Sequence, residues 1–134
     1  MIGIARPLTA WVGSVLGDGI LTRWGELGKL SDAAMVKAAP GDPLVRAYLG
    51  GGGMYRFSYE VYLRITPRTS SQRISGMERL EALADAIRAG GYPDCDGITW
   101  VGHAPTQQPA LIETQSDGAE LYQLTAQLSW RERS

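Results

Sequence analysis

The sequence predicts a single α+β domain in which a mainly antiparallel or mixed sheet carries two helices on one face. Two stretches, near residues 7–21 and 72–88, place apolar residues at helical spacing. Two others, 55–65 and 120–132, alternate between apolar and polar residues with the period of a strand. The chain of 134 residues suits one core, so we expect residues 1–134 to form one domain.

The N-terminal part begins with the first predicted helix, residues 7–21. Its apolar residues recur every three or four positions and would form one buried stripe: Leu8, Trp11, Val12, Val15 and Leu16. Pro7 suits the first turn, and Gly17 with Gly19 should end or fray the helix. Residues 24–28 read as an irregular connection, and a short strand is predicted at 33–38.

The middle of the chain contains two predicted strands. Pro40 to Pro43 forms a strong turn signal, because proline fixes φ and glycine accepts positive φ. A strand over 44–49 follows, then four glycines, and then the clearest strand, 55–65. Its alternation predicts one core face and one mainly polar face.

The C-terminal half begins with the second predicted helix, residues 72–88. Ser75 to Glu78 offers a capping-box pattern slightly inside the start, and two glycines followed by Pro93 close the helix. Three strands should complete the chain, at 98–102, 111–114 and 120–132. The order is helix, strands, helix, strands, for which helices on one face of a mainly antiparallel sheet are the simplest arrangement.

Composition excludes several classes of function. Lys and Arg total 13 against 14 Asp and Glu, so no basic excess favours sequence-specific nucleic-acid binding. The chain has one cysteine and one histidine, which cannot form an intrachain disulfide or a Cys/His metal cage and which fit a reducing cytoplasm. No stretch approaches the ~20 apolar residues that cross a bilayer, and the N-terminus lacks the pattern of a signal peptide, so we expect no membrane partner.

The run Gly50, Gly51, Gly52 and Gly53 is the most conspicuous motif. Successive glycines can bring backbone N–H groups close to a phosphate, which would suit a small enzyme with a phosphorylated ligand. A P-loop, however, enters a helix and carries Lys followed by Ser or Thr, whereas this run enters a strand. We therefore favour a hairpin tip or an assembly loop.

Other reactive side chains lack partners in the sequence. His103 and Cys95 are not accompanied by residues typical of a catalytic signature, and the acidic neighbours Asp94 and Asp96 would disfavour a thiolate. Two carboxylates in one turn are also too few oxygen ligands for a calcium loop. The sequence thus predicts no catalytic residues, no metal site and no cofactor, and hence a protein that is not an enzyme.

Aromatic residues near segment edges are candidates for contact with a partner. Trp24 and Trp100 could each cover the rim of the core or anchor another protein. With long strands, a glycine-rich loop and a near-neutral charge, the domain can present edges and loops to copies of itself.

The order of segments resembles the tail terminator and minor capsid (tail-completion) proteins of long-tailed bacteriophages. Residues 43–52 and 55–63 look like their paired strands, and residues 77–87 are similar to the helix that follows. Residues 113–132 resemble their last strand with its preceding turn. The resemblance covers roughly residues 43–133, while the N-terminal helix agrees only in type and place.

This resemblance implies a structural protein of the virion, assembled in the host cytoplasm and located in the tail or neck. It implies a homo-oligomeric ring, commonly a hexamer, that caps the tail tube, ends its polymerisation and binds the connector of the head. The predicted assembly interface combines Trp24 and Trp100 with two connections, one formed by Gly50, Gly51, Gly52 and Gly53, the other by Gln115, Ser116, Asp117 and Gly118. Another head-to-tail connector, an unrelated oligomeric binding module and the phosphate-binding enzyme remain as alternatives.

Overall fold

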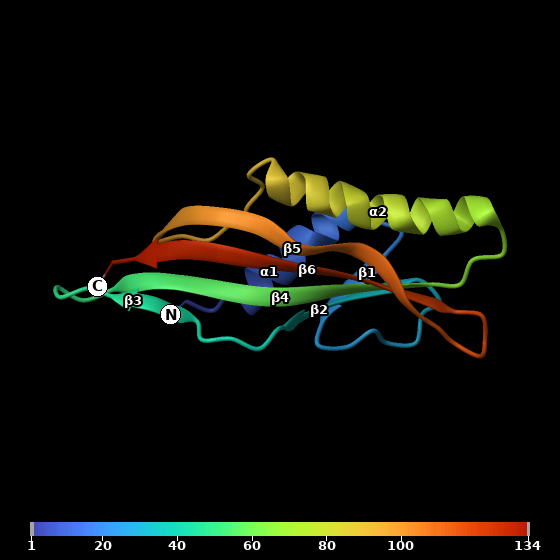
Figure 1. Ribbon diagram of the computed structural model, residues 1–134, viewed down its shortest axis with the longest axis horizontal. Helices are drawn as coiled ribbons and strands as arrows, with labels where there is room; N and C mark the ends of the chain where they lie inside the picture. Colours follow the sequence, from blue (N-terminus) through green and yellow to red (C-terminus); the bar gives the residue numbers. More distant parts are fainter. Residues whose placement is uncertain (1, 134) are drawn as a thin grey trace.

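Two helices and six strands follow one another in the computed structural model, which describes residues 2–133 (Figure 1). The elements are α1 (Ala5–Leu16), β1 (Leu21–Trp24), β2 (Ala33–Ala38), β3 (Leu44–Ala47), β4 (Gly53–Ile65), α2 (Ser70–Arg88), β5 (Ile98–Thr114) and β6 (Glu120–Glu132). The strands form one mixed sheet in the order β1-β2-β4-β6-β5, and β3 pairs with β4 as well. Only β1 and β2 pair in parallel, so the predicted α+β class with a mainly antiparallel or mixed sheet is confirmed.

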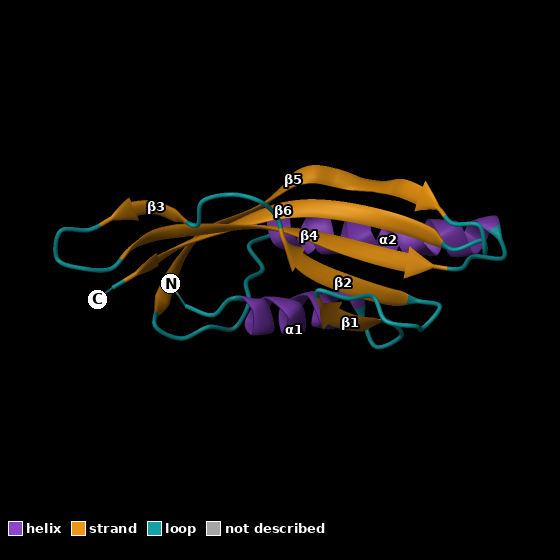
Figure 2. Cartoon of the chain, turned by 90° about the horizontal axis from the view of Figure 1, so that it is seen from below, coloured by secondary structure: helices purple, strands orange, loops and turns teal. Residues whose placement is uncertain are grey.

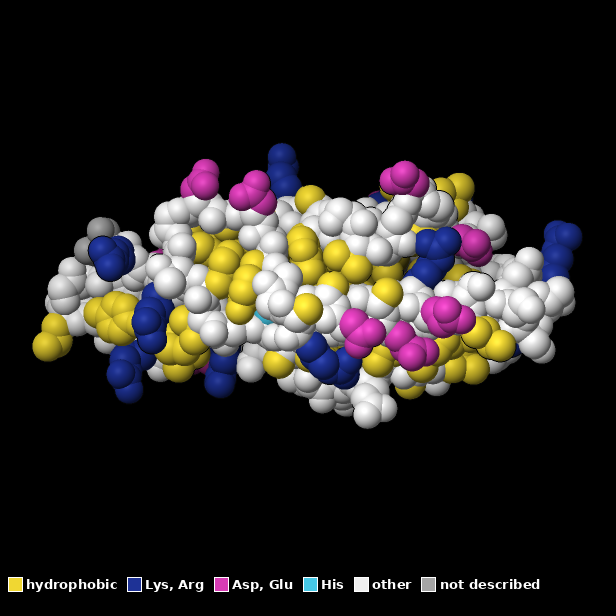
Figure 3. Space-filling model, turned by 90° about the horizontal axis from the view of Figure 1, so that it is seen from above, with side chains coloured by type: hydrophobic (Ala, Val, Ile, Leu, Met, Phe, Trp, Pro, Cys, Tyr) yellow, Lys and Arg dark blue, Asp and Glu magenta, His cyan; other side chains and the backbone are white. Residues whose placement is uncertain are grey.

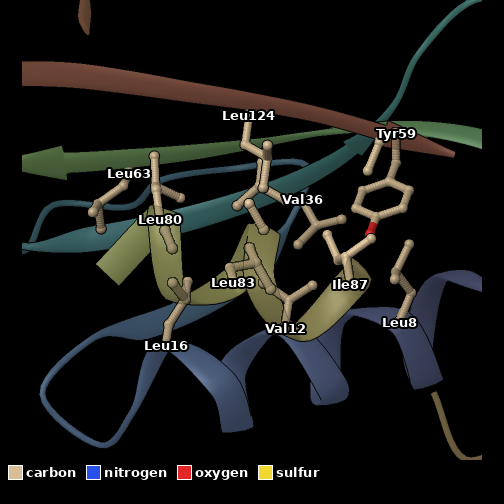
Figure 4. Close-up of a cluster of buried hydrophobic side chains, with 14 of the residues drawn as sticks. Leu8, Val12, Leu16, Val36, Tyr59, Leu63, Leu80, Leu83, Ile87 and Leu124 are labelled. Atoms are coloured by element: carbon tan, nitrogen blue, oxygen red, sulfur yellow. The ribbon is translucent and has the colours of Figure 1, made fainter. Parts of the chain in front are cut away.

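The core lies between one face of the sheet and the two helices, as predicted. Figure 2 views the sheet from the side without helices, and both helices lie behind it. Figure 4 shows the packing, in which leucines, valines and isoleucines from both helices meet alternate residues of β2, β4 and β6. The labelled side chains are Leu8, Val12, Leu16, Val36, Tyr59, Leu63, Leu80, Leu83, Ile87 and Leu124.

The centre of the sheet is the antiparallel pair β4 and β6. The pairing runs without a break from Gly53 opposite Glu132 to Ile65 opposite Glu120. Because successive side chains point to opposite faces, an unbroken register puts Tyr59 and its alternate neighbours on the same buried face as the alternate residues of β6. The alternation in the sequence therefore predicted both strands correctly.

The ends of the helices differ from the sequence prediction at one cap. Gly17 ends α1 with a φ of 98°, as expected, and its N–H donates to the Gly13 carbonyl. Thr69, rather than the predicted Ser75 motif, caps α2, because its hydroxyl accepts from the N–H of Gln72 at 3.2 Å. Residues 75–78 lie inside the helix, where Gly76 packs against Ile65.

Two strand predictions were wrong. Residues Leu21–Trp24 form β1, although the sequence predicted the end of a helix and then an irregular connection. Parallel pairing with β2 supplies the hydrogen bonds that this short, largely exposed segment needs. The predicted strands at 98–102 and 111–114 are one strand, β5, which accommodates Pro105 and Pro109 because it lies at the edge of the sheet and its register shifts there.

Replacing Leu83 with alanine should destabilise the protein by about 2–5 kcal/mol, because this fully buried side chain would leave a cavity between α2 and the sheet. Leu49→Ala removes the same atoms from a fully exposed position and should change stability by less than about 0.5 kcal/mol. Urea unfolding followed by circular dichroism measures both effects. Equal losses in the two variants would contradict this placement of the core.

Candidate functional site

The two predicted assembly loops lie at opposite ends of the molecule. The glycine run follows β3 at one end, and the turn at residues 115–118 joins β5 to β6 at the other (Figure 2). The strand β6 extends between them from Glu120 to Glu132, a length of roughly 40 Å at about 3.3 Å per residue. One chain thus cannot combine the two loops in a single site. The two loops would have to contact different partners, or distant parts of the same partner.

The end with the glycine run projects beyond both helices. We call residues 44–57 together with residues 128–133 the tongue. It consists of β3, the loop that follows, the first part of β4 and the paired end of β6. Figure 1 shows that α1 and α2 stop short of this end. Tyr55 and Phe57 on the helix side of the tongue are accordingly only half-buried, whereas Tyr59, further along the same strand, is fully buried.

Glycine is required at the tip of the tongue by the shape of the turn. The N–H of Gly51 donates to the carbonyl of Tyr48 at 3.1 Å, and the N–H of Tyr48 donates to the carbonyl of Gly52 at 3.2 Å. Gly51 and Gly52 have φ values of 94° and 76°, and a side chain on Gly52 would clash with the backbone of Glu132. A side chain on Gly50 would meet no atom, so the run contains both constrained and tolerant positions.

The same geometry differs from that of a phosphate-binding loop. The run joins two antiparallel strands, β3 and β4, and does not lead into a helix. A P-loop depends on a helix N-terminus to direct several N–H groups at the anion. The arrangement gives the phosphate-binding alternative no support and agrees with the predicted hairpin tip.

The surface of the tongue is both basic and apolar. Its charged residues are four arginines, Arg46, Arg56, Arg131 and Arg133, and a single acid, Glu132. Leu49 is fully exposed, and Leu44 and Val45 are 44% and 46% exposed. None of these residues was predicted from the sequence as part of an interface. A signal was present in the sequence, since Arg46 follows the apolar residues Leu44 and Val45 in a segment predicted as a strand.

The two candidate tryptophans have different surroundings. Trp100 is half-buried, stacks on Tyr92 at 5.2 Å between ring centroids and meets the edge of Trp130 at 5.9 Å, so it covers the rim of the core. Trp24 at the end of β1 is 40% exposed and lies beside Phe57. The involvement of either in assembly stays a prediction.

Trp24 also lines a groove of about 540 Å³ between α1 and β1. Small side chains form its walls: Ala5, Thr9, Ala10, Gly13 and Thr22, with Arg6 at the margin. The groove exposes apolar surface next to a free strand edge, and such an edge can receive another protein chain.

His103 forms hydrogen bonds through both of its ring nitrogens. Nδ1 lies 2.7 Å from the carbonyl of Gly91, which can only accept, so Nδ1 carries the proton. Nε2 therefore accepts from the hydroxyl of Tyr59 at 2.5 Å. Both nitrogens are engaged, and burial lowers the pKa of His103 although the Gly91 carbonyl opposes that shift. The ring ties β5 to β4 and to the loop after α2.

Other groups that could carry chemistry are poorly placed for it. Burial raises the pKa of the Cys95 thiol, and the charges of Asp94 and Asp96 raise it further, so the thiolate is disfavoured. Among residues 2–133, no three side chains of His, Cys, Asp or Glu gather as metal ligands.

Within the same range, no helix is long and apolar enough to span a bilayer.

Solved structures share this fold. A chain from the virion of a native gene transfer agent particle superimposes with a TM-score of 0.53 at 14% identity, and the match covers 90% of this chain and 84% of that one. A second solved chain gives a TM-score of 0.55 at 12% identity over 98% of this chain and 91% of its own. No protein-family model and no curated protein matches the sequence. At these identities the likeness establishes a common fold.

Acidification should weaken the fold through His103. Burial holds the pKa of His103 in the folded protein below its ordinary value of 6.5, so below pH 6.5 the unfolded chain binds a proton that the folded chain does not. The free energy of unfolding should therefore fall as the pH drops from 6.5 towards the lowered pKa. Urea unfolding between about pH 5 and pH 8 measures it. His103→Gln should lose this part of the slope, and an identical slope in both proteins would refute the assignment.

Proposed function

We propose that the protein is a tail terminator of a long-tailed bacteriophage or a related particle. In this role a ring of copies, a hexamer in our proposal, caps the tail tube, ends its polymerisation and offers the surface to which the connector of the head binds. The observation that carries the proposal is the fold shared over most of its length with a chain of a gene transfer agent virion. The order of segments between residues 43 and 133, which resembles the tail terminator family, supports it independently.

The shape of the molecule suits such a role. A ring requires contacts between two different surfaces of neighbouring copies, repeated until the ring closes. The tongue and the turn at residues 115–118 lie at opposite ends of one sheet, so a single copy can contact a neighbour and the tube at the same time (Figure 2). The chemistry asked of the chain is binding without turnover, in the tail or neck of the virion.

A different neck protein, such as another head-to-tail connector, is the second candidate, because a shared fold with a virion chain supports it equally. The two differ in the structure that they bind. A terminator binds the end of a tail tube, whereas a connector of the head binds to the head in the absence of tubes.

We expect the purified protein, alone or after addition of tail tubes, to form rings, because ring closure is the step that stops polymerisation in this proposal. Mass measurement in solution and negative-stain imaging reveal the number of copies and the position on the tube. Rings that cap tube ends agree with the proposal, and rings found only on heads favour the connector. A persistent monomer that forms no ring on added tubes contradicts both.

Replacing both Gly51 and Gly52 with proline should impair ring formation. Proline holds φ near −65°, which is incompatible with the positive φ of both residues, so the tip of the tongue must change shape. The core lies elsewhere, and the domain should remain folded by circular dichroism. Gly50→Ala is the matched control, because its side chain would meet no neighbouring atom. Normal rings in the proline variant would show that the tip is not an assembly contact.

A further inference from the structure

Three arginines of the tongue lie on the face of the sheet that carries no helix. Arg46 is opposite Met54 in the β3–β4 pair, and Met54 is opposite Arg131 in the β4–β6 pair, so Arg46, Met54 and Arg131 share one face. Arg56 lies two residues beyond Met54 on the same strand and therefore on that face as well. The three are exposed, and none has an ion pair within the described part of the chain. This end of the molecule thus presents an unneutralised positive surface.

The outer surface of α2 has the opposite charge. Glu78, Glu81 and Asp85 are exposed and follow the helical spacing that puts them on one side. In Figure 3, acidic side chains follow one another along the part of the molecule where α2 lies, and basic ones gather at the end with the tongue.

The arginines of α2 leave part of this acidic row unpaired. Two of them bind groups outside α2: Arg73 contacts Glu120, and Arg79 donates to the carbonyl of Leu16. The third, Arg88, pairs with Asp85 at the end of the acidic row. Glu78 and Glu81 have no ion pair among residues 2–133.

A groove of about 280 Å³ lies beside the acidic row, between α2 and β5. Met77, Ala84 and Pro109 give it an apolar lining, and the other lining residues are Gln108, Glu81, Asp85 and Arg88. Arg88 pairs with Asp85 at 3.3 Å, so Glu81 is the acid of this groove without an ion pair among residues 2–133. Leu49 at the tip of the tongue is fully exposed and lies three residues from Arg46. One surface thus combines an apolar pocket with acids, and the other an apolar side chain with arginines.

The two surfaces face opposite sides of the sheet. The arginines lie on the face without helices, and the acidic row lies on the outside of a helix that covers the other face (Figures 1 and 2). A single chain cannot bring them together. Two copies can, and because the surfaces differ, the contact repeats from copy to copy in the head-to-tail manner that builds a ring.

We infer that the tongue of one copy docks on α2 of the next copy. In this contact Leu49 enters the groove beside Met77, and Arg46 and Arg131 face Glu78 and Glu81. The inference rests on the proposed function in that this contact would be the repeating interface of the ring. The α2 surface is accordingly occupied by a second copy of this chain. If the test shows a tail tube protein bound there instead, the inference is wrong.

Charge reversal tests the contact with two variants. One carries Arg46→Glu and Arg131→Glu on the tongue, and the other carries Glu78→Arg and Glu81→Arg on α2. All four positions are exposed, so both variants should fold. Each alone opposes like charges, and self-association measured by analytical ultracentrifugation should weaken at least about tenfold. Mixed in equal amounts, the variants should associate again in alternation, because each tongue then meets an oppositely charged helix.

Lys29→Glu with Arg68→Glu is the matched control for the tongue variant, since it makes the same change in net charge at exposed positions outside both surfaces. It should associate like the wild type.

Unchanged association of the tongue or helix variant, or failure of the mixture to recover, would overturn the inference. If these variants still form rings that cap tubes, the proposed function stands while this interface fails. If the charge-dependent contact forms and rings never bind tubes, the interface stands and the terminator role fails. A wild type that does not associate with or without tubes overturns both.

Discussion

The long antiparallel pairing of β4 and β6 is the interaction on which the rest of the structure depends. It joins every residue of β4 to one of β6, and its buried face receives both helices. A shift of one residue would turn the buried side chains of one strand, such as Tyr59 and Leu63 of β4, towards solvent while those of β6 still faced the core, so the core and the register enforce one another. The other strands extend this pair at its two edges: β2 and β3 on one side, β5 on the other.

The same pairing creates the surface available for assembly. The two strands continue past the helices, so their ends form a tongue in which Tyr55 and Phe57 are only half-buried, while Trp100 lies against the buried Trp130. Aromatic rings continue from the core into this region, as in the contact of Tyr55 with Trp130. His103 lies against Trp11 of α1, and its hydrogen bonds to Gly91 and Tyr59 fix β5 there. A stiff sheet thus extends into an exposed, basic and apolar end, a suitable combination for binding another protein.

The sequence predicted the parts of the fold that repeat a pattern. Both helices and the strands β4 and β6 have a strict period, because one side of each packs against the core. The strand β1 was missed, because its four residues have no period and depend on pairing with β2. The single strand β5 was predicted as two, at 98–102 and 111–114, and the intervening residues include Pro105 and Pro109, which an edge strand tolerates. The Ser75 motif failed as a cap because a local pattern cannot reveal that Gly76 packs under Ile65.

For the candidate site, the sequence identified the glycine tip and the turn at residues 115–118 as connections but not their separation. That separation depends on the register of the sheet, a long-range property. The arginines of the tongue were overlooked because an overall charge of −1 hides a local excess. The local excess arises because the fold places Arg46 of β3 beside Arg56 of β4 and Arg131 of β6.

Hydrogen–deuterium exchange of the free protein and of the protein bound to tail tubes tests the central claim most directly, namely that the tongue is the assembly element and the helix-covered sheet is its support. In the free protein, amides of residues 44–52, which form β3 and the tip of the tongue, should exchange faster than those of the buried segment 59–65. On assembly, protection should rise in residues 44–56 and along the outer face of α2. Unchanged exchange in the tongue, with new protection confined to other parts of the chain, would contradict the account.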